Sequence, residues 1–364
     1  MTALRHVTLV AGARPNFMKI APLIRAIEQA ARRGSVLRYR LVHTGQHYDK
    51  MMSDTFFSEL GIPAPDANLG CGGGSQAEQT AAVMVAFEKD LAAHPTDLVV
   101  VVGDVTGTMA CTLVAKKADV HVAHVEAGIR SGDLTMPEEI NRIVTDALAD
   151  EFYTTSETAG GNLRRAGVPA DRIRFVGNIM IDTLLANRGR FRAPGIFREA
   201  GLEEKAYLVL TLHRPANVDD AARLAATLGA IRQGAKGRKV VFPVHPRTAR
   251  VLTDARVDTS GFLLTAPMGY LEFNYLVERS LGVITDSGGI TEETTVMHVP
   301  CLTLRDNTER PETVDIGTNC LIGTCPDNIV PALDRLLAGR WKSGSVPPLW
   351  DGHTAERIVS YWTE

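Results

Sequence analysis

An uninterrupted run of apolar, mostly β-branched residues at positions 98–102, Leu-Val-Val-Val-Val, constrains the fold of this chain more than any other feature. Such a run, with no polar alternation, is typical of a strand covered on both faces, as in a parallel sheet between two helical layers. Similar runs alternate with helix-period segments along almost the whole sequence. The alternation predicts an α/β protein built on parallel sheets.

The chain has 364 residues, more than a single hydrophobic core usually accommodates, so two domains are expected. We expect an N-terminal Rossmann-like domain over residues 1–180, a hinge region rich in Arg and Gly over 181–205, and a C-terminal Rossmann-like domain over 206–345. Residues 346–364 are predicted to form a helix that returns to the N-terminal domain. Two such domains facing each other would bring the carboxyl ends of their strands to one central cleft, where open α/β sheets bind ligands.

Composition excludes several classes of protein. A net charge of −3 gives no electrostatic basis for a nucleic-acid or membrane partner. The sequence has neither the apolar core of a signal peptide nor a stretch long enough to span a membrane. The five cysteines are scattered and odd in number, which argues against a zinc site and favours a reducing cytoplasm.

Two strand-to-helix turns predict anion-binding sites. After the first strand, Arg14 and Lys19 stand at the start of a helix, although a plain turn with surface cations explains them equally well. In the C-terminal half, Ser287, Gly288 and Gly289 follow a strand and offer successive backbone N–H groups. The alternative there is that Asp286 or Ser287 merely caps the helix.

Carboxylates end two strands of the N-terminal half. Asp104 follows the buried run, where it either caps the next helix or lies at the ligand-binding edge. Glu126 ends the next strand and needs a partner if it is buried; Arg130 or Arg142 is expected to supply it. His121 and His124 do not suggest a shared metal with Glu126, because side chains at these two strand positions point to opposite faces.

Other polar side chains allow more than one interpretation. Glu138 and Arg142 lie four apart on a predicted helix over 137–149, which is the spacing of an ordinary surface ion pair. Glu139 is expected to be solvated or to cap that helix. His213 and His245 each end a strand of the C-terminal domain, and the position favours a functional role, more so for His213. Gln46 and His47 are either ligand contacts or loop residues, while Arg305, Thr308, Glu309 and Arg310 form a loop rich in donors.

Together these groups predict a pyrophosphate held by cations of both domains and a sugar facing the carboxylates. Glu126 and Glu138 are then interpreted as acid/base groups.

Eight stretches, in order and over nearly the whole chain, resemble those of the bacterial non-hydrolysing UDP-N-acetylglucosamine 2-epimerases: GARPNFMKIAPL, HTGQHYD, GDVTGT, HVEAGIRSGDLTMPEEINR, TLHRPANVD, PVHPRT, TDSGGITEE and RDNTERPE. The resemblance implies a fold like that of the two-domain GT-B glycosyltransferases. It also implies a homodimer whose domains close on a UDP-sugar.

By this resemblance, Asp104, Glu126 and Glu138 match the catalytic carboxylates, and His213 matches a histidine near the leaving pyrophosphate. The remaining positions are assigned to substrate binding: Arg14, Lys19, Arg142, His245, Ser287, Gly288, Gly289, Glu293 for the ribose, and Arg310. The implied reaction is C2 epimerisation by elimination and re-addition of UDP through a 2-acetamidoglucal. It requires neither a redox cofactor nor a metal.

Four other functions remain open. An epimerase of a modified sugar, such as UDP-2,3-diacetamido-glucuronic acid, shares the HTGQHYD, MPEEINR and HPRT stretches. A hydrolysing epimerase would release free N-acetylmannosamine. A glycosyltransferase would use the same fold without needing all three carboxylates. A nucleotide-sugar binding protein would bind UDP and tolerate replacement of all three.

Overall fold

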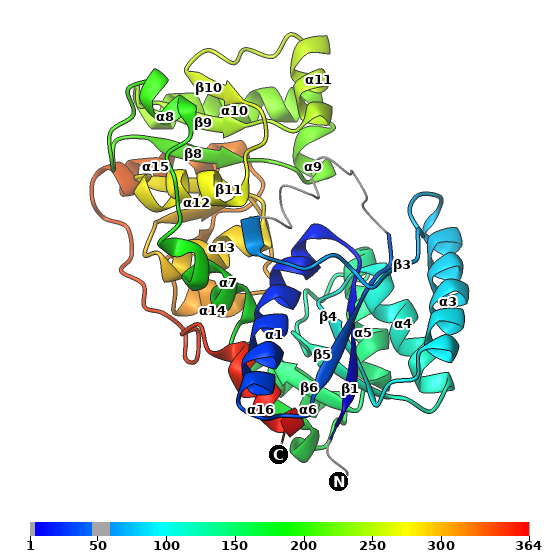
Figure 1. Cartoon of the computed structure of the whole chain (residues 1–364). Coiled ribbons are helices and arrows are strands. Elements are labelled where there is room, and N and C mark those ends of the chain that lie inside the picture. The colour runs from blue at the N-terminus through cyan, green and yellow to red at the C-terminus, as the bar shows by residue number, and fades with distance from the viewer. Residues whose placement is uncertain (1–3, 46–58, 364) are drawn as a thin grey trace. The chain divides into compact units, whose positions relative to one another are not determined.

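The computed structural model describes residues 4–45 and 59–363. The chain divides into two compact units (Figure 1). Unit 1 comprises residues 1–186 together with 348–364, and unit 2 comprises residues 187–347.

Unit 1 is built on a parallel sheet whose described strands follow the order β3-β2-β1-β4-β5-β6-β7. Its strands are β1 (His6–Ala11), β2 (Arg38–His43), β3 (Ala67–Asn68), β4 (Leu98–Val102), β5 (His121–Val125), β6 (Glu151–Thr154) and β7 (Ile173–Phe175). Its helices are α1 (Arg14–Arg32), α3 (Gln76–Ala93), α4 (Thr106–Lys117), α5 (Pro137–Leu148), α6 (Glu157–Arg165), α7 (Ile179–Arg188, which continues into unit 2) and α16 (Thr354–Thr363), with a 3-10 turn η1 (Ala170–Arg172).

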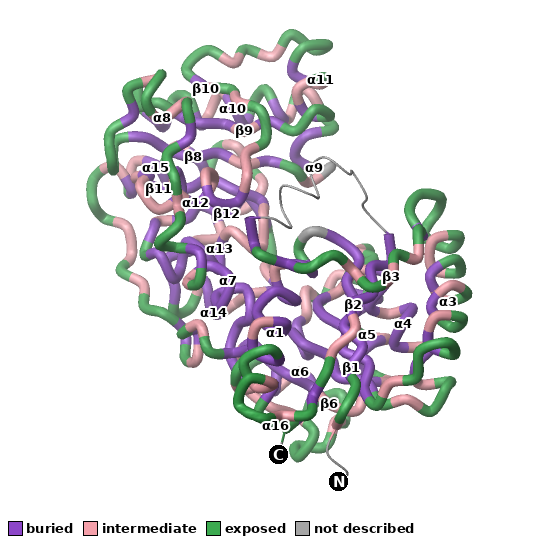
Figure 2. Tube along the Cα trace, in the orientation of Figure 1, coloured by how far each residue is buried: buried purple, intermediate pink, exposed green. Residues whose placement is uncertain are grey.

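The apolar run of β4 lies at the centre of this sheet and is wholly buried (Figure 2). Helices α3, α4 and α5 lie side by side on one face, and α1 lies on the other (Figure 1). Phe87 of α3 and Cys111 of α4 belong to the same core as Val99 and Val101. The run is apolar throughout because helices cover it on both faces.

Strand order reverses between β1 and β4, since the chain runs outward from β1 to β2 and later from β4 to β5. Such a switch point leaves a crevice at the carboxyl ends of the two strands. The turns that follow β1, β4 and β5 therefore come together at one edge of unit 1.

A proline inside α1 explains one link between distant segments. Pro22 has no N–H to donate to the carbonyl of Met18, four residues earlier. The hydroxyl of Thr183 in α7 donates to that carbonyl instead, at 2.5 Å. The C-terminal helix α16 packs against α1, and Asp182 of α7 accepts the first backbone N–H groups of α16, from Thr354 and Ala355.

Unit 2 is built on a second parallel sheet, whose described strands follow the order β10-β9-β8-β11-β12-β13. Its strands are β8 (Leu208–Thr211), β9 (Val240–Pro243), β10 (Phe262–Thr265), β11 (Gly282–Thr285), β12 (Cys301–Thr303) and β13 (Asn319–Leu321). Its helices are α8 (Gly195–Glu199), α9 (Pro215–Val218), α10 (Ala221–Ala235), α11 (Pro246–Asp254), α12 (Tyr270–Arg279), α13 (Gly288–Val296), α14 (Pro311–Asp315) and α15 (Ile329–Leu337), with a 3-10 turn η2 (Pro326–Asn328). Here the order reverses between β8 and β11.

The predicted fold class is confirmed, because each unit is a parallel α/β sheet with a Rossmann-like strand order. Helix α8 lies within the segment predicted as a hinge. No helix within residues 4–45 and 59–363 combines the length and apolarity needed to cross a membrane.

Candidate active site

Glu126 combines burial with an uncommon backbone conformation. It follows β5 directly, is 3% exposed, and has a left-handed backbone with φ of 69°. A residue other than glycine adopts this conformation only when its surroundings hold it there. The Glu126 N–H donates to the carbonyl of Tyr153, and the side chain forms an ion pair with Lys19, with Nζ and Oε2 2.5 Å apart.

Lys19 was predicted to contact the nucleotide, and Arg130 or Arg142 to pair with Glu126. In the structure the Lys19 side chain is 8% exposed and its ammonium contacts Glu126, while Arg130 contacts Asp146 and Arg142 contacts Asp104. The pairing that the structure gives therefore differs from the one expected.

Gly103 explains how the ion pair fits against the turn after β4. A Cβ at this position would lie 2.8 Å from Lys19 Nζ and 3.7 Å from Glu126 Oε2, and φ is +65°. A side chain here would force the Lys19 ammonium, and with it the ion pair, to shift, in a backbone conformation that favours glycine. Asn16 ties the ends of β1 and β4 together, since its Oδ1 accepts from the N–H groups of Gly12 and Ala13 and its Nδ2 donates to the carbonyl of Val102.

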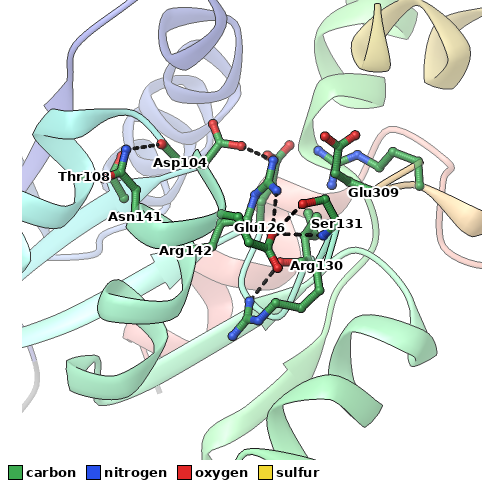
Figure 3. A network of polar contacts seen from close by, with 12 residues as sticks. Asp104, Thr108, Glu126, Arg130, Ser131, Asn141, Arg142 and Glu309 are labelled. Carbon is green, nitrogen blue, oxygen red and sulfur yellow. Dashed lines mark hydrogen bonds and ion pairs between the residues drawn. The ribbon is translucent and has the colours of Figure 1, made fainter. Parts of the chain in front are cut away.

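Asp104 does not cap α4, because Val105 occupies the cap position. Instead its carboxylate accepts a hydrogen bond from Arg142, and its backbone carbonyl accepts one from Asn141 Nδ2 at 2.8 Å (Figure 3). Both donors belong to α5. The Asp104 carboxylate remains 28% exposed, so it is oriented by the helix and still accessible.

The expectation that Glu139 is solvated or a cap is wrong. Glu139 is 1% exposed and accepts hydrogen bonds from the N–H groups of Ser131 and Gly132 and from Arg142 Nη1, the last at 3.0 Å. Burial alone would raise the pKa of this carboxyl, but these donors outweigh it and leave the pKa below its usual value.

Arg142 therefore pairs with Glu139 and Asp104, in place of the surface pair with Glu138 that the spacing suggested. Glu138 lies exposed on the first turn of α5.

The two histidines of β5 have different partners, as their opposite orientations predict. His121 is exposed and contacts Asp150 at 3.2 Å, whereas His124 is fully buried and contacts Asp146 at 2.7 Å. Among residues 4–45 and 59–363, no group of three His, Cys, Asp or Glu side chains is arranged to hold a metal ion.

In unit 2, Asp286 organises the crevice between β8 and β11. It is completely buried and accepts hydrogen bonds from the backbone N–H groups of His213 and Arg214 and from Asn217 Nδ2. The His213 Nδ1 lies 2.7 Å from Asp286 Oδ1, while the rest of the ring is exposed. Burial would raise the pKa of Asp286, but His213 and the other donors hold it below its usual value. Asp286 was not predicted as a site residue.

The predicted anion cradle lies at the N-terminus of α13. Ser287 occupies the N-cap position of α13, but its side chain makes no capping hydrogen bond. The structure therefore does not support the alternative that Ser287 merely caps the helix. A Cβ at Gly289 would meet nothing within 4 Å. The N-terminal N–H groups of this helix and its dipole suit a negatively charged group.

Two glutamates of α13 are buried but have different partners. Glu293 accepts a hydrogen bond from the hydroxyl of Tyr270 at 2.8 Å, and burial raises its pKa to about 7. Glu292 forms an ion pair with Arg310. Of the remaining predicted site residues, His245 is an exposed N-cap of α11. Gln46, His47 and the side chain of Arg14 lie outside the described part of the structure.

The family model for UDP-N-acetylglucosamine 2-epimerase matches residues 29–363 of the chain. The chain belongs to the UDP-N-acetylglucosamine 2-epimerase family. The UDP-N-acetylglucosamine 2-epimerase of Methanocaldococcus jannaschii is 37% identical to it, over 98% of each chain. The UDP-2,3-diacetamido-2,3-dideoxy-D-glucuronate 2-epimerase of Pseudomonas aeruginosa is 36% identical, again over 98% of each chain.

The crystal structure of the M. jannaschii UDP-GlcNAc 2-epimerase in complex with UDP-GlcNAc and UDP superposes on the chain with a TM-score of 0.87, covering 98% of this chain and 99% of that one. This family resemblance and the GT-B-type fold were both predicted from the sequence, and both are confirmed. The members of this family are isomerases, so the chain is an epimerase by family.

Proposed function

We propose that the protein interconverts UDP-N-acetylglucosamine and UDP-N-acetylmannosamine by elimination and re-addition of UDP. The observation that carries this proposal is the full-length similarity to an epimerase whose structure holds UDP-GlcNAc and UDP. The buried carboxylate at the strand edge of unit 1 supplies the chemistry that such a reaction needs.

The C2 proton of the sugar is not adjacent to a carbonyl, so its direct removal is very unfavourable. In the proposed reaction the C1–O bond to UDP breaks first, and its electron pair leaves with the diphosphate. The positive charge at C1 acidifies the C2 proton, which a carboxylate removes to give 2-acetamidoglucal. Protonation of C2 on the opposite face, with return of UDP to C1, completes the inversion.

We assign the proton transfers to unit 1. Glu126, held by Lys19, and Asp104, held by Arg142 and Asn141, are oriented carboxylates, and Glu138 is the third acid/base group by resemblance to the family. In this proposal Lys19 and Arg142 hold carboxylates in addition to any contact with substrate, which refines the binding role first assigned to them.

We assign nucleotide binding to unit 2 and to Arg14. Ser287, Gly288 and Gly289 hold the diphosphate, and Glu293 binds the ribose hydroxyls. His213, fixed by Asp286, stabilises the departing diphosphate. The roles of Arg310, which contacts Glu292, and of His245, which caps α11, stay predictions from the sequence.

A second substrate is supported by a specific observation. The Pseudomonas relative that epimerises the diacetamido-glucuronate sugar is 36% identical, against 37% for the M. jannaschii enzyme, so overall identity does not separate the two. The ratio of kcat/KM for the two UDP-sugars decides between them. We expect the ratio to favour UDP-N-acetylglucosamine.

The roles of the carboxylates are tested by Glu126→Gln, Asp104→Asn and Glu138→Gln. Each is expected to lower kcat by about 10²- to 10⁴-fold while UDP still binds. Glu157→Gln is the control for Glu138→Gln, since Glu157 is also an exposed glutamate in the first turn of a helix. Full turnover by all three carboxylate variants would place the proton transfers at other residues.

We also propose that the enzyme acts in the cytoplasm as a homodimer and serves polysaccharide biosynthesis. The cysteines support a reducing compartment, since all five are free thiols and Cys71, Cys111 and Cys301 are buried. Light scattering of the purified chain gives its mass in solution; a monomer would contradict the dimer.

A further inference from the structure

His124 is buried against the turn that carries Asp104, yet the reaction proposed above does not use it. Its side chain is 0% exposed, and both ring nitrogens are engaged. Nε2 lies 2.8 Å from the carbonyl oxygen of Gly103, and Nδ1 lies 2.7 Å from Asp146 Oδ1. Gly103 immediately precedes Asp104.

The partners of His124 determine where its protons are. A carbonyl oxygen only accepts, so Nε2 must donate. Asp146 is held in turn, since its Oδ2 accepts from the N–H of Gly128 at 3.1 Å and from Arg130 Nη1 at 2.6 Å. Although burial would raise the pKa of Asp146, the charges of His124 and Arg130 keep it below its usual value. Nε2 therefore donates to the Gly103 carbonyl, while Asp146 holds the ring through Nδ1.

The Gly103 peptide is held from both sides by β5. Its N–H donates to the carbonyl of Val125 at 3.0 Å, and its carbonyl accepts from His124. A glycine with φ of +65° has many alternative conformations, so these two bonds select one of them. The direction of this peptide sets the direction in which the Asp104 side chain leaves the turn.

Residues of helix α5 hold the same turn through several hydrogen bonds. Asn141 donates to the Asp104 carbonyl, Arg142 donates to its carboxylate, and Asp146 anchors His124 (Figure 3 shows the first two). Residues 142 and 146 are one helical turn apart and so share a face of α5. Among these contacts, the one from His124 reaches the peptide group that precedes Asp104.

We propose that His124 is a positioning residue for Asp104: by donating from Nε2 to the Gly103 carbonyl, with Asp146 fixing the ring, it aims the Asp104 carboxylate at the substrate. The inference rests on the proposed function, in which Asp104 is an acid/base group.

Two replacements of His124 separate this role from simple packing. An asparagine amide reaches as far as Nδ1 and keeps the bond to Asp146, whereas a glutamine amide reaches as far as Nε2 and keeps the bond to Gly103. Each loses one buried hydrogen bond and some ring volume, so His124→Asn and His124→Gln should lose similar stability. Only His124→Asn releases the peptide before Asp104.

Asp146→Asn is a third variant that preserves the geometry. The asparagine amide can donate to Nδ1 of a neutral ring while its oxygen still accepts from Gly128 and Arg130. Nε2 then keeps its proton and its bond to Gly103. This variant keeps the proposal testable if either His124 variant fails to fold.

The experiment measures kcat and KM for UDP-N-acetylglucosamine together with the melting temperature of each variant. We expect kcat to fall by about 10²-fold in His124→Asn, as for a displaced catalytic group, with KM changed by less than about 3-fold. His124→Gln and Asp146→Asn should stay within about 10-fold of the wild type. Equal kcat losses in His124→Asn and His124→Gln, or a 10²-fold loss in Asp146→Asn, would overturn the proposal.

A measurement without substrate keeps this inference separate from the proposed function. The carbonyl carbon of Gly103 reports its own hydrogen bond by NMR. Its resonance should move in His124→Asn and stay in place in His124→Gln; a resonance unmoved in His124→Asn would overturn the proposed contact. If the wild-type protein does not convert UDP-N-acetylglucosamine, the proposed function fails, and this NMR comparison still tests the contact.

Discussion

Lys19 Nζ and Glu126 Oε2 lie 2.5 Å apart in the interior of unit 1, where both side chains are more than nine-tenths buried. Lys19 lies in α1, the helix that follows β1, and Glu126 directly follows β5; the strand order brings both to the same edge of the sheet. Removing two opposite charges from water is unfavourable unless they compensate each other. The pair therefore links the fold of this edge to the carboxylate that we place at the centre of the reaction.

Replacing one partner of this pair should be much more harmful than replacing both. Lys19→Met leaves the Glu126 charge buried without its ammonium, and we expect the free energy of unfolding to fall by about 3–5 kcal/mol. Adding Glu126→Gln to it should recover part of the loss. Denaturant unfolding of the two single variants and the double variant measures this coupling. Additive losses would show that the pair is not coupled.

Gly103→Ala should affect both stability and turnover. The new methyl would lie 2.8 Å from Lys19 Nζ, in a backbone with φ of +65°. Gly167→Ala is the control, because φ there is +90° but nothing lies within 4 Å. In the control the free energy of unfolding should fall only by the cost of a left-handed backbone at alanine, about 1–2 kcal/mol, and kcat should not change. Equal stability and equal kcat in the two variants would contradict the tight packing of Gly103 against the ion pair.

Gly289→Ala tests the diphosphate cradle without disturbing the protein. The methyl would meet no protein atom within 4 Å, and φ is not left-handed, so stability should stay the same or rise by about 0.4–1 kcal/mol. A diphosphate lying against this helix end would meet the methyl, and calorimetry should find UDP binding at least about 10-fold weaker. Gly229→Ala, an equally open glycine in α10, should leave UDP affinity unchanged. Unchanged affinity in Gly289→Ala would place the diphosphate elsewhere.

Glu293 should make the stability of unit 2 depend on pH. Burial raises its pKa from 4.5 to about 7, so the folded form holds a proton that the unfolded form loses. The contribution of this bound proton to the free energy of unfolding is complete below pH 4.5, falls as the pH rises, and is lost above pH 7. The total change is about 3 kcal/mol at 1.36 kcal/mol per pH unit. Glu293→Gln should remove this decline, as followed by unfolding between pH 4.5 and 8. If the free energy of unfolding depended on pH in the same way in the wild type and in Glu293→Gln, the raised pKa would be contradicted.

Much of the fold follows from local sequence patterns. The apolar run of β4 required helices on both faces, and the helix predicted over 137–149 is observed as α5, Pro137–Leu148. Strand β3 has two residues, too few to leave a pattern.

The partners of the charged residues were harder to predict. Lys19 and Glu126 are 107 positions apart, and Asp286 meets the N–H of His213 across 73 positions; such pairings depend on which strands are neighbours. Glu139 was missed for a different reason. Positions 139, 142 and 146 recur with helical spacing, which places them on one face of α5. A polar inner face of this kind would have indicated a buried network instead of a solvated glutamate.

The most direct test of the account is proton NMR of UDP-N-acetylglucosamine incubated with the protein in heavy water. The proposed elimination predicts that UDP-N-acetylmannosamine appears with deuterium at C2, while UDP remains attached to the sugar at equilibrium. No exchange at C2, or release of free N-acetylmannosamine, would contradict the proposed reaction.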